Sequence, residues 1–179
     1  MGKMAAMRTI AKILYGGAAL AALATPALAQ NSATATAAGS ATIIQPIAVT
    51  KTADLGFGKI VKPTTGTSTI AVTSTGNSRS ITGGNAVAAD ALGVTSAAFN
   101  VTGEGAQVFN ISVPTTFAMT SGTNTLVVTT TQSATSATLS GSIGTAGSQS
   151  FGVGGSFPLA TSAVSGAYTG NFVVTVAYN

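Results

Sequence analysis

Three carboxylates, Asp54, Asp90 and Glu104, are the strongest candidates for acid–base chemistry in this chain of 179 residues. A pair of carboxylates can serve as acid and base in glycoside hydrolysis. Asp54, however, lies beside an expected strand, Asp90 lies in a segment of mixed pattern, and Glu104 lies in an expected turn. Such positions are typical of turn and capping residues. The sequence therefore favours structural roles for all three side chains.

Most other catalytic and metal-binding groups are missing from the sequence. The chain has no His and no Cys, which excludes metal sites built on imidazole or thiolate and nucleophiles that need either residue. The few carboxylates do not cluster as a Ca²⁺ site requires. A Ser–Lys dyad remains open, but no particular Ser is marked out. We therefore expect a non-catalytic protein without a cofactor or metal site.

The glycine run "GVGGSF" at residues 152–157 is a weak match to a phosphate-binding loop. Such a loop needs a strand before it and a helix after it. Pro158 follows the run directly, and no helical pattern begins there. The run instead predicts a bulge or a close approach of two backbone segments.

Residues 1–29 have the pattern of a cleavable secretory signal. Lys3, Arg8 and Lys12 form a basic start, an apolar stretch of 12 residues follows from Ile13, and "ALA" at 27–29 is a cleavage site. Twelve apolar residues are too few to span a bilayer, which needs about 20. We expect export to the periplasm, the cell surface or the medium, and no transmembrane segment in the mature chain.

Removing the signal changes the charge of the chain. The full sequence has seven basic and three acidic residues, and three of the basic residues lie in the signal. The mature part then keeps a net charge of 4 − 3 = +1. The basic character of the whole chain therefore gives no reason to expect a nucleic-acid partner.

Short β-rich runs alternate with Gly-, Ser-, Asn- and Thr-rich turns through the mature chain, and no segment has the pattern of an amphipathic helix. This pattern is typical of a β-sandwich or barrel. We expect strands near residues 41–50, 54–61, 67–74, 96–102, 106–113, 124–131, 136–143, 149–159 and 168–178. The best hairpin candidate joins 96–102 to 106–113 through the glycines at 103 and 105. Residues 75–95 have mixed signals, either a long loop with a short strand or a helical turn at 88–92.

The mature chain divides into an N-terminal extension, 30–45, and a single domain, 46–179. The extension has alternating residues, and one alternating set consists almost entirely of small side chains: Ala33, Ala35, Ala37, Gly39, Ala41 and Ile43. Pro46 follows and indicates an edge, a bulge or a switch between sheets. The extension could equally be a flexible leader.

The sequence ends on a period-two pattern that is typical of a half-buried strand. Phe172, Val174, Val176 and Tyr178 lie on one parity and smaller or polar residues on the other. A terminal strand has two edges, and each edge needs a partner strand or some protection against unwanted pairing. The sequence does not reveal which segment lies beside it.

Both ends of the mature chain resemble known proteins. "SATIIQPIAVTKTADLGFGKIV" at 40–61 and "GSFPLATSAVSGAYTGNFVVTVAYN" at 155–179 resemble a family of small secreted bacterial proteins that is defined only as a domain of unknown function. The end also resembles that of chaperone–usher pilus subunits, including the archaic, spore-coat-U-like type. Those subunits have a penultimate aromatic residue, alternating apolar residues before it, and a Gly fourteen places from the end, here Gly166.

The resemblance implies an immunoglobulin-like, pilin-like antiparallel β-sandwich that lacks its final strand. A periplasmic chaperone would fill the groove first, and the extension of a like subunit would replace it at an outer-membrane usher. The resemblance makes roughly Ser32 to Ile44 the donor strand, and the strand that ends at Tyr178 would form one wall of the groove. It therefore implies a structural subunit of a surface fibre or pilus. Many such pilins have a disulfide, which this chain cannot form. The alternative is a self-contained envelope sandwich that binds a ligand or partner, with residues 31–44 paired in its own sheet.

Overall fold

The computed structural model describes residues 32–179, so the predicted signal peptide lies outside the described part. The chain divides into two units, Met1–Ser40 and Ala41–Asn179. Residues 32–40 of the first unit, and residues 41–47 of the second, contain no strand. The predicted strand over 41–50 therefore begins later than expected, at Ala48, two residues after the proline that lacks a donor for strand pairing.

The described residues contain fourteen strands and no helix. The strands are β1 (Ala48–Ala53), β2 (Gly56–Phe57), β3 (Ile60–Val61), β4 (Thr67–Val72), β5 (Arg79–Thr82), β6 (Val87–Ala88), β7 (Val94–Thr95), β8 (Ala97–Glu104), β9 (Val108–Ser112), β10 (Thr116–Ser121), β11 (Asn124–Gln132), β12 (Ser136–Thr138), β13 (Ala146–Ala160) and β14 (Thr175–Tyr178). Every ladder between them is antiparallel. The predicted all-β antiparallel sandwich is confirmed.

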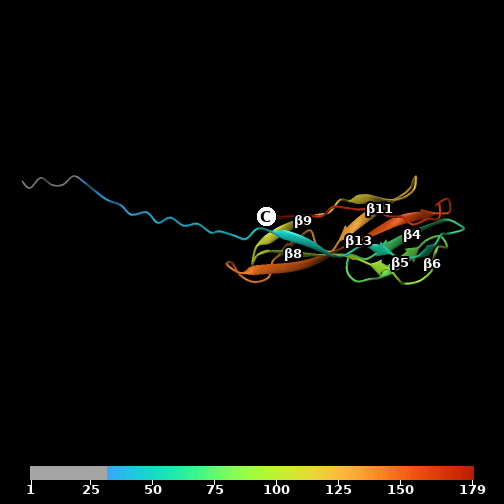
Figure 1. Cartoon of the computed structure of the whole chain (residues 1–179), viewed down its shortest axis with the longest axis horizontal. Helices are drawn as coiled ribbons and strands as arrows, with labels where there is room; N and C mark the ends of the chain where they lie inside the picture. Colours follow the sequence, from blue (N-terminus) through green and yellow to red (C-terminus); the bar gives the residue numbers. More distant parts are fainter. Residues whose placement is uncertain (1–31) are drawn as a thin grey trace, which may run out of the picture. The chain divides into compact units, whose positions relative to one another are not determined.

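Ten of the strands form one large sheet of seven strands and one small sheet of three, and the other four form two separate ladders, β2–β7 and β3–β6 (Figure 1). The large sheet has the order β1–β8–β13–β11–β10, and β4 also pairs with β13 and carries β5 on its other side. The fifteen-residue β13 pairs with β8 through its first half and with β4 through its last six residues. The small sheet has the order β12–β9–β14. Within residues 32–179 no helix is long and apolar enough to span a membrane.

Two apolar clusters hold the sheets together. The first lies between β8 and β13 of the large sheet and β9 of the small one, and it contains Val101, Phe109 and Val153, which have no exposed surface. The second lies between β4, β11 and the second half of β13 and contains Ile70 and Val128. Alternate residues of each strand point into these clusters, as the period-two sequence pattern requires.

The glycine run in β13 marks a crowded place, as the sequence predicted. A Cβ atom on Gly152 would lie 2.0 Å from the Ser74 carbonyl oxygen, and one on Gly154 would lie 2.3 Å from the Val72 carbonyl oxygen. No side chain fits at such distances from backbone atoms. The run therefore allows close approach of the β4 backbone and has no phosphate-loop geometry.

The predicted hairpin between 96–102 and 106–113 is wrong. β8 pairs with β1 and β13, whereas β9 pairs with β12 and β14 in the other sheet. The chain crosses between sheets at Gly105 and Ala106, whose N–H groups donate to the carbonyls of Thr145 and Leu139. Ala106 adopts the left-handed region with φ of 60°. The parity of the two strands was nevertheless informative, because Phe99 and Phe109 both enter the first apolar cluster.

Three other segments differ from the expectation. Residues 75–95 contain three short strands, β5, β6 and β7, and no helical turn. β6 and β7 form small two-stranded ladders with β3 and β2. β10 was not predicted at all, although Phe117 and Met119 alternate there with smaller residues. The predicted strand over 168–178 is shorter, because regular pairing with β9 begins only at Thr175.

Candidate functional site

The first and last strands of the domain are both edge strands, and they belong to different sheets. β1 pairs only with β8 at one edge of the large sheet, and β14 pairs only with β9 at one edge of the small sheet. The two strands approach each other, yet no ladder joins them. Each therefore leaves a row of backbone groups without a partner strand on the side that faces the other.

A groove lies between residues 51–62, which contain β2 and β3, and residues 163–172, which precede β14. It consists of a cavity of about 570 Å³ and a second of about 490 Å³. Leu55, Met119 and Tyr168 line both cavities, so the two are adjacent. We refer to this feature as the terminal groove.

Large apolar side chains line the terminal groove and are only half-buried. They come from both walls and from β10 and β11 between them: Leu55, Ile60, Phe117, Met119, Leu126 and Phe172. The Phe172 ring lies 5.0 Å from the Phe117 ring and 6.3 Å from the Phe99 ring, so aromatic contacts continue from the groove into the first apolar cluster. The groove thus keeps apolar surface in water that one further strand would cover.

The C-terminal wall follows β10 before it joins the small sheet. Thr169 and Thr120 exchange backbone hydrogen bonds of 3.0 and 2.8 Å. A Cβ atom on Gly166 would lie 2.5 Å from the Ser121 hydroxyl oxygen, and one on Gly170 would lie 2.1 Å from the Ala118 carbonyl oxygen. Gly170 therefore requires glycine because it packs against backbone, whereas at Gly166 the close atom is the end of a side chain that can rotate away. Further along, Phe172, Val174, Val176 and Tyr178 are half-buried and alternate with exposed residues.

Three polar residues are joined by hydrogen bonds at the point where the extension leaves the domain. The Tyr178 hydroxyl donates to the Gln45 carbonyl oxygen at 2.9 Å and accepts the Glu104 N–H at 2.7 Å. The Glu104 carboxylate is buried, with 1% exposed, and accepts the Gln45 N–H at 3.1 Å and the Gly144 N–H. We call this set of contacts the exit clasp. It fixes the backbone at Gln45 to the last strand and to β8.

Lys62 marks one end of the groove. Its ammonium donates to the carbonyl oxygen of Ala163 at 3.2 Å and of Thr161 at 3.4 Å. These contacts join the two walls where they meet. Lys62 therefore bounds the groove at the end where its two walls meet.

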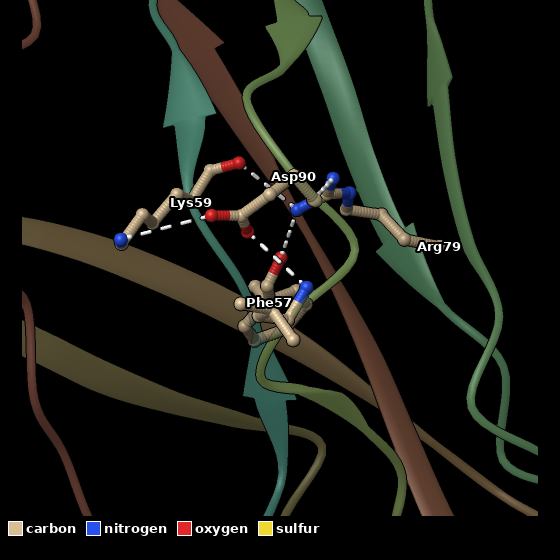
Figure 2. Close-up of polar contacts among 5 residues, drawn as sticks. Phe57, Lys59, Arg79 and Asp90 are labelled. Atoms are coloured by element: carbon tan, nitrogen blue, oxygen red, sulfur yellow. Dashed lines mark hydrogen bonds and ion pairs between the residues drawn. The ribbon is translucent and has the colours of Figure 1, made fainter.

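Arg79 holds the β2–β3 wall in place (Figure 2). Its guanidinium donates to the carbonyl oxygens of Phe57 at 2.6 Å, Lys59 at 3.1 Å and Asp90 at 2.5 Å. The Lys59 ammonium also lies 3.7 Å from the Asp90 carboxylate. Gly58, with φ of 68°, lies between the first two carbonyls, and a Cβ atom there would be 2.7 Å from the guanidinium. The sequence offered no signal for this long-range clasp.

The three carboxylates considered for catalysis have separate partners. Asp54 pairs with Lys51 at the surface, Asp90 accepts the Leu92 N–H at 3.2 Å, and Glu104 belongs to the exit clasp. Among residues 32–179 there is no group of three or more metal-ligating His, Cys, Asp or Glu side chains. Each carboxylate organises a turn or a strand end, and Glu104 has a larger structural role than a turn residue.

The candidate donor residues fall on both sides of the unit boundary. Ala33, Ala35, Ala37 and Gly39 lie in residues 32–40, outside any strand. Ala41 and Ile43 lie in the second unit before β1, and Ile43 is 92% exposed. The structure thus places no large side chain of the extension in the apolar clusters.

A family model, Domain of unknown function (DUF4402), matches residues 47–178. The chain belongs to this family. The match begins two residues after Gln45 and ends at Tyr178, so the DUF4402 domain includes both walls of the terminal groove. No curated protein and no solved structure matches the chain. The geometry of this DUF4402 domain is therefore the basis for proposing a function.

Proposed function

We propose that this protein is a non-catalytic structural subunit of a bacterial surface fibre or pilus that assembles by donor-strand exchange. The observation that carries the proposal is the terminal groove, an apolar gap between residues 51–62 and residues 163–172, next to the two terminal edge strands β1 and β14. An extended segment of another chain can add a strand to such an edge, with backbone hydrogen bonds for affinity and side-chain pockets for specificity.

The N-terminal extension of a like subunit is the occupant that fits best. Its candidate inward parity has small side chains from Ala33 to Ala41 and one large one, Ile43. Small side chains let the donor backbone approach both walls closely. Ile43 is 92% exposed in the single chain, so almost all of its apolar surface is free to enter a neighbouring groove.

Antiparallel insertion agrees with the lengths of the donor segment and of the C-terminal wall, and with the sizes of the two cavities. Residues 33–43 number 43 − 33 + 1 = 11, and the C-terminal wall, residues 163–172, numbers 172 − 163 + 1 = 10. An antiparallel donor would place Ile43 near residue 164, beside Lys62 and in the larger cavity. All ladders of the domain are antiparallel, and this arrangement is slightly more stable per residue than the parallel one.

The open groove makes the single subunit costly to keep folded. Fully burying one aliphatic or aromatic side chain is worth roughly 1.5–3 kcal/mol. The six groove residues keep up to about a third of their surface exposed, so covering that surface would contribute at most about 3–6 kcal/mol. That amount is a substantial part of the whole stability of a domain, roughly 5–15 kcal/mol. A subunit with an empty groove is therefore marginal, which supports a role for a periplasmic chaperone before an outer-membrane usher assembles the fibre.

A second candidate function uses the same groove for a small ligand. Tyr168 lines both cavities, and its hydroxyl donates to the Val164 carbonyl at 2.8 Å. A monomeric envelope protein could hold an apolar ligand there. The two functions exclude each other, because a donor strand and a ligand would compete for the same walls.

Deletion of residues 31–44 tests the main proposal. Gln45 remains in this variant, so the exit clasp is preserved. We expect the mature chain to form multimers that resist SDS without heating, and the deletion variant to form none. A synthetic peptide of residues 32–44 should then bind the variant and raise its melting temperature. Stable, fully ordered monomers in both samples, with no response to the peptide, would overturn the proposal and favour the ligand-binding function.

A further inference from the structure

Two exposed isoleucines lie together at the end of the domain where the extension leaves. Gln45 and Gly144 donate to the two oxygens of the same Glu104 carboxylate. Ile44 and Ile143 directly precede these donors, so the shared carboxylate brings them close. Ile143 is 58% exposed and Ile44 is 42% exposed. We call this pair the exit patch.

Three exposed valines lie near the Lys62 end of the groove, two on the β3–β6 ladder and one on the C-terminal wall. Val61 and Val87 are cross-strand partners in the β3–β6 ladder. Val164 follows Ala163, whose carbonyl accepts the Lys62 ammonium, and Lys62 follows Val61. All three are more than half exposed. We call these valines the rim patch. Figure 1 shows β6 and the C-terminus at opposite ends of the strand-containing body, so the two patches lie far apart in one copy.

The exit clasp leaves almost no linker between a donor strand and its own domain. If Ile43 occupies a neighbouring groove, only Ile44 separates it from Gln45, which is fixed by hydrogen bonds to Glu104 and Tyr178. Two Cα–Cα steps reach at most about 7.6 Å. The two domains must therefore touch at this junction.

We propose that the exit patch of each subunit packs against the rim patch of the next, so that the domains stack end to end along the fibre. This inference rests on the proposed function and on antiparallel insertion, which brings the donor's own domain to the Lys62 end of the acceptor. The contact is apolar on both sides and is made of branched aliphatic side chains that water otherwise covers. It is heterologous, which allows open linear growth.

Engineered disulfides can test the contact cleanly, because the chain has no Cys of its own. The double variant Ile143→Cys/Val87→Cys has one thiol in each patch. The matched control is Ile143→Cys/Val127→Cys. Val127 is 55% exposed, similar to Val87 at 59%, but lies on β11 outside both patches. Mild oxidation of assembled protein is followed by full heat denaturation in SDS, with and without reductant.

We expect a disulfide-linked ladder from the first variant that reductant removes, at least tenfold more abundant than in the control. SDS-resistant multimers without such a ladder would overturn the end-to-end contact and leave donor-strand exchange standing. Covalent dimers from the single variant Ile143→Cys would show two exit patches together and would also overturn it. Absence of SDS-resistant multimers from the unmodified mature chain would instead reject the proposed function, and the contact with it.

Discussion

Exchanging Thr42 and Ile43 tests which side chains of the donor strand point into the groove. Thr42 and Ile43 lie on opposite parities, so in an inserted strand one points into the groove and the other away from it. The double exchange Thr42→Ile/Ile43→Thr keeps the composition and overall hydrophobicity of the extension. It nevertheless places a hydroxyl in the larger cavity and the isoleucine in water.

The structure sets the size of the expected loss. Ile43 is 92% exposed before assembly, so insertion can bury nearly the whole side chain. Losing that burial costs about 2–3 kcal/mol, which corresponds to roughly 30- to 150-fold weaker subunit attachment. The variant Ile43→Ala should show a similar loss. The single variant Thr42→Ile, which keeps Ile43, should behave like the unmodified chain.

The assay is the rate at which monomers appear from SDS-resistant multimers at a series of temperatures. The exchange variant and Ile43→Ala should dissociate faster by the factor given above, and Thr42→Ile should not. If the exchange variant dissociates like the unmodified chain, side-chain parity does not matter and the extension does not insert as a strand. If Thr42→Ile is the damaging change, the extension inserts with the opposite parity.

Three further substitutions test the parts of the domain that shape the groove. Tyr178→Phe leaves the Glu104 N–H without an acceptor and should lower the unfolding free energy, measured in urea, by about 1–3 kcal/mol. The control Tyr168→Phe removes only an exposed hydrogen bond and should change the unfolding free energy little. In Arg79→Lys, one ammonium cannot reach three carbonyls, so both the melting temperature and the multimer yield should fall. The control Lys51→Ala removes an exposed ion pair and should change the unfolding free energy by no more than about 0.5 kcal/mol. Gly154→Ala places a Cβ atom 2.3 Å from a backbone oxygen and should cost about 1–3 kcal/mol by overpacking, measured as a shift of the urea midpoint. Unchanged stability in Tyr178→Phe, in Arg79→Lys or in Gly154→Ala would show that the corresponding contact contributes nothing in solution.

Local sequence patterns predicted the strands better than their partners. The alternation in "FVVTVAY" and "AAFNVTG" correctly indicated strands and the faces that point inward, because that information is contained in neighbouring residues. The false hairpin between β8 and β9 shows where such patterns fail. A turn with two glycines is compatible with a hairpin or with a crossing between sheets. Here the long-range bonds from Gly105 and Ala106 to Thr145 and Leu139 decide between them.

The groove itself was only partly accessible from the sequence. Its C-terminal wall was named in advance, but β10 was missed, and with it Phe117 and Met119, which line the groove between its walls. The pattern of "TFAMTS" before a glycine turn would have indicated this strand. The Arg79 clasp could not have been found, because nothing in the sequence connects Arg79 with carbonyls about twenty residues earlier.

The exit clasp explains how a domain without disulfides holds its two terminal strands together, although they belong to different sheets. Tyr178 and Gln45 are 133 residues apart in sequence, yet one hydroxyl joins them, and the same hydroxyl accepts from β8 in the large sheet. A buried carboxylate would be costly alone, but Glu104 accepts two backbone N–H groups, one of them from Gln45. A noncovalent tie therefore fixes both the start of β1 and the end of β14. Because this tie holds the chain at the point where the extension begins, force or motion in the extension would reach the last strand directly through the clasp.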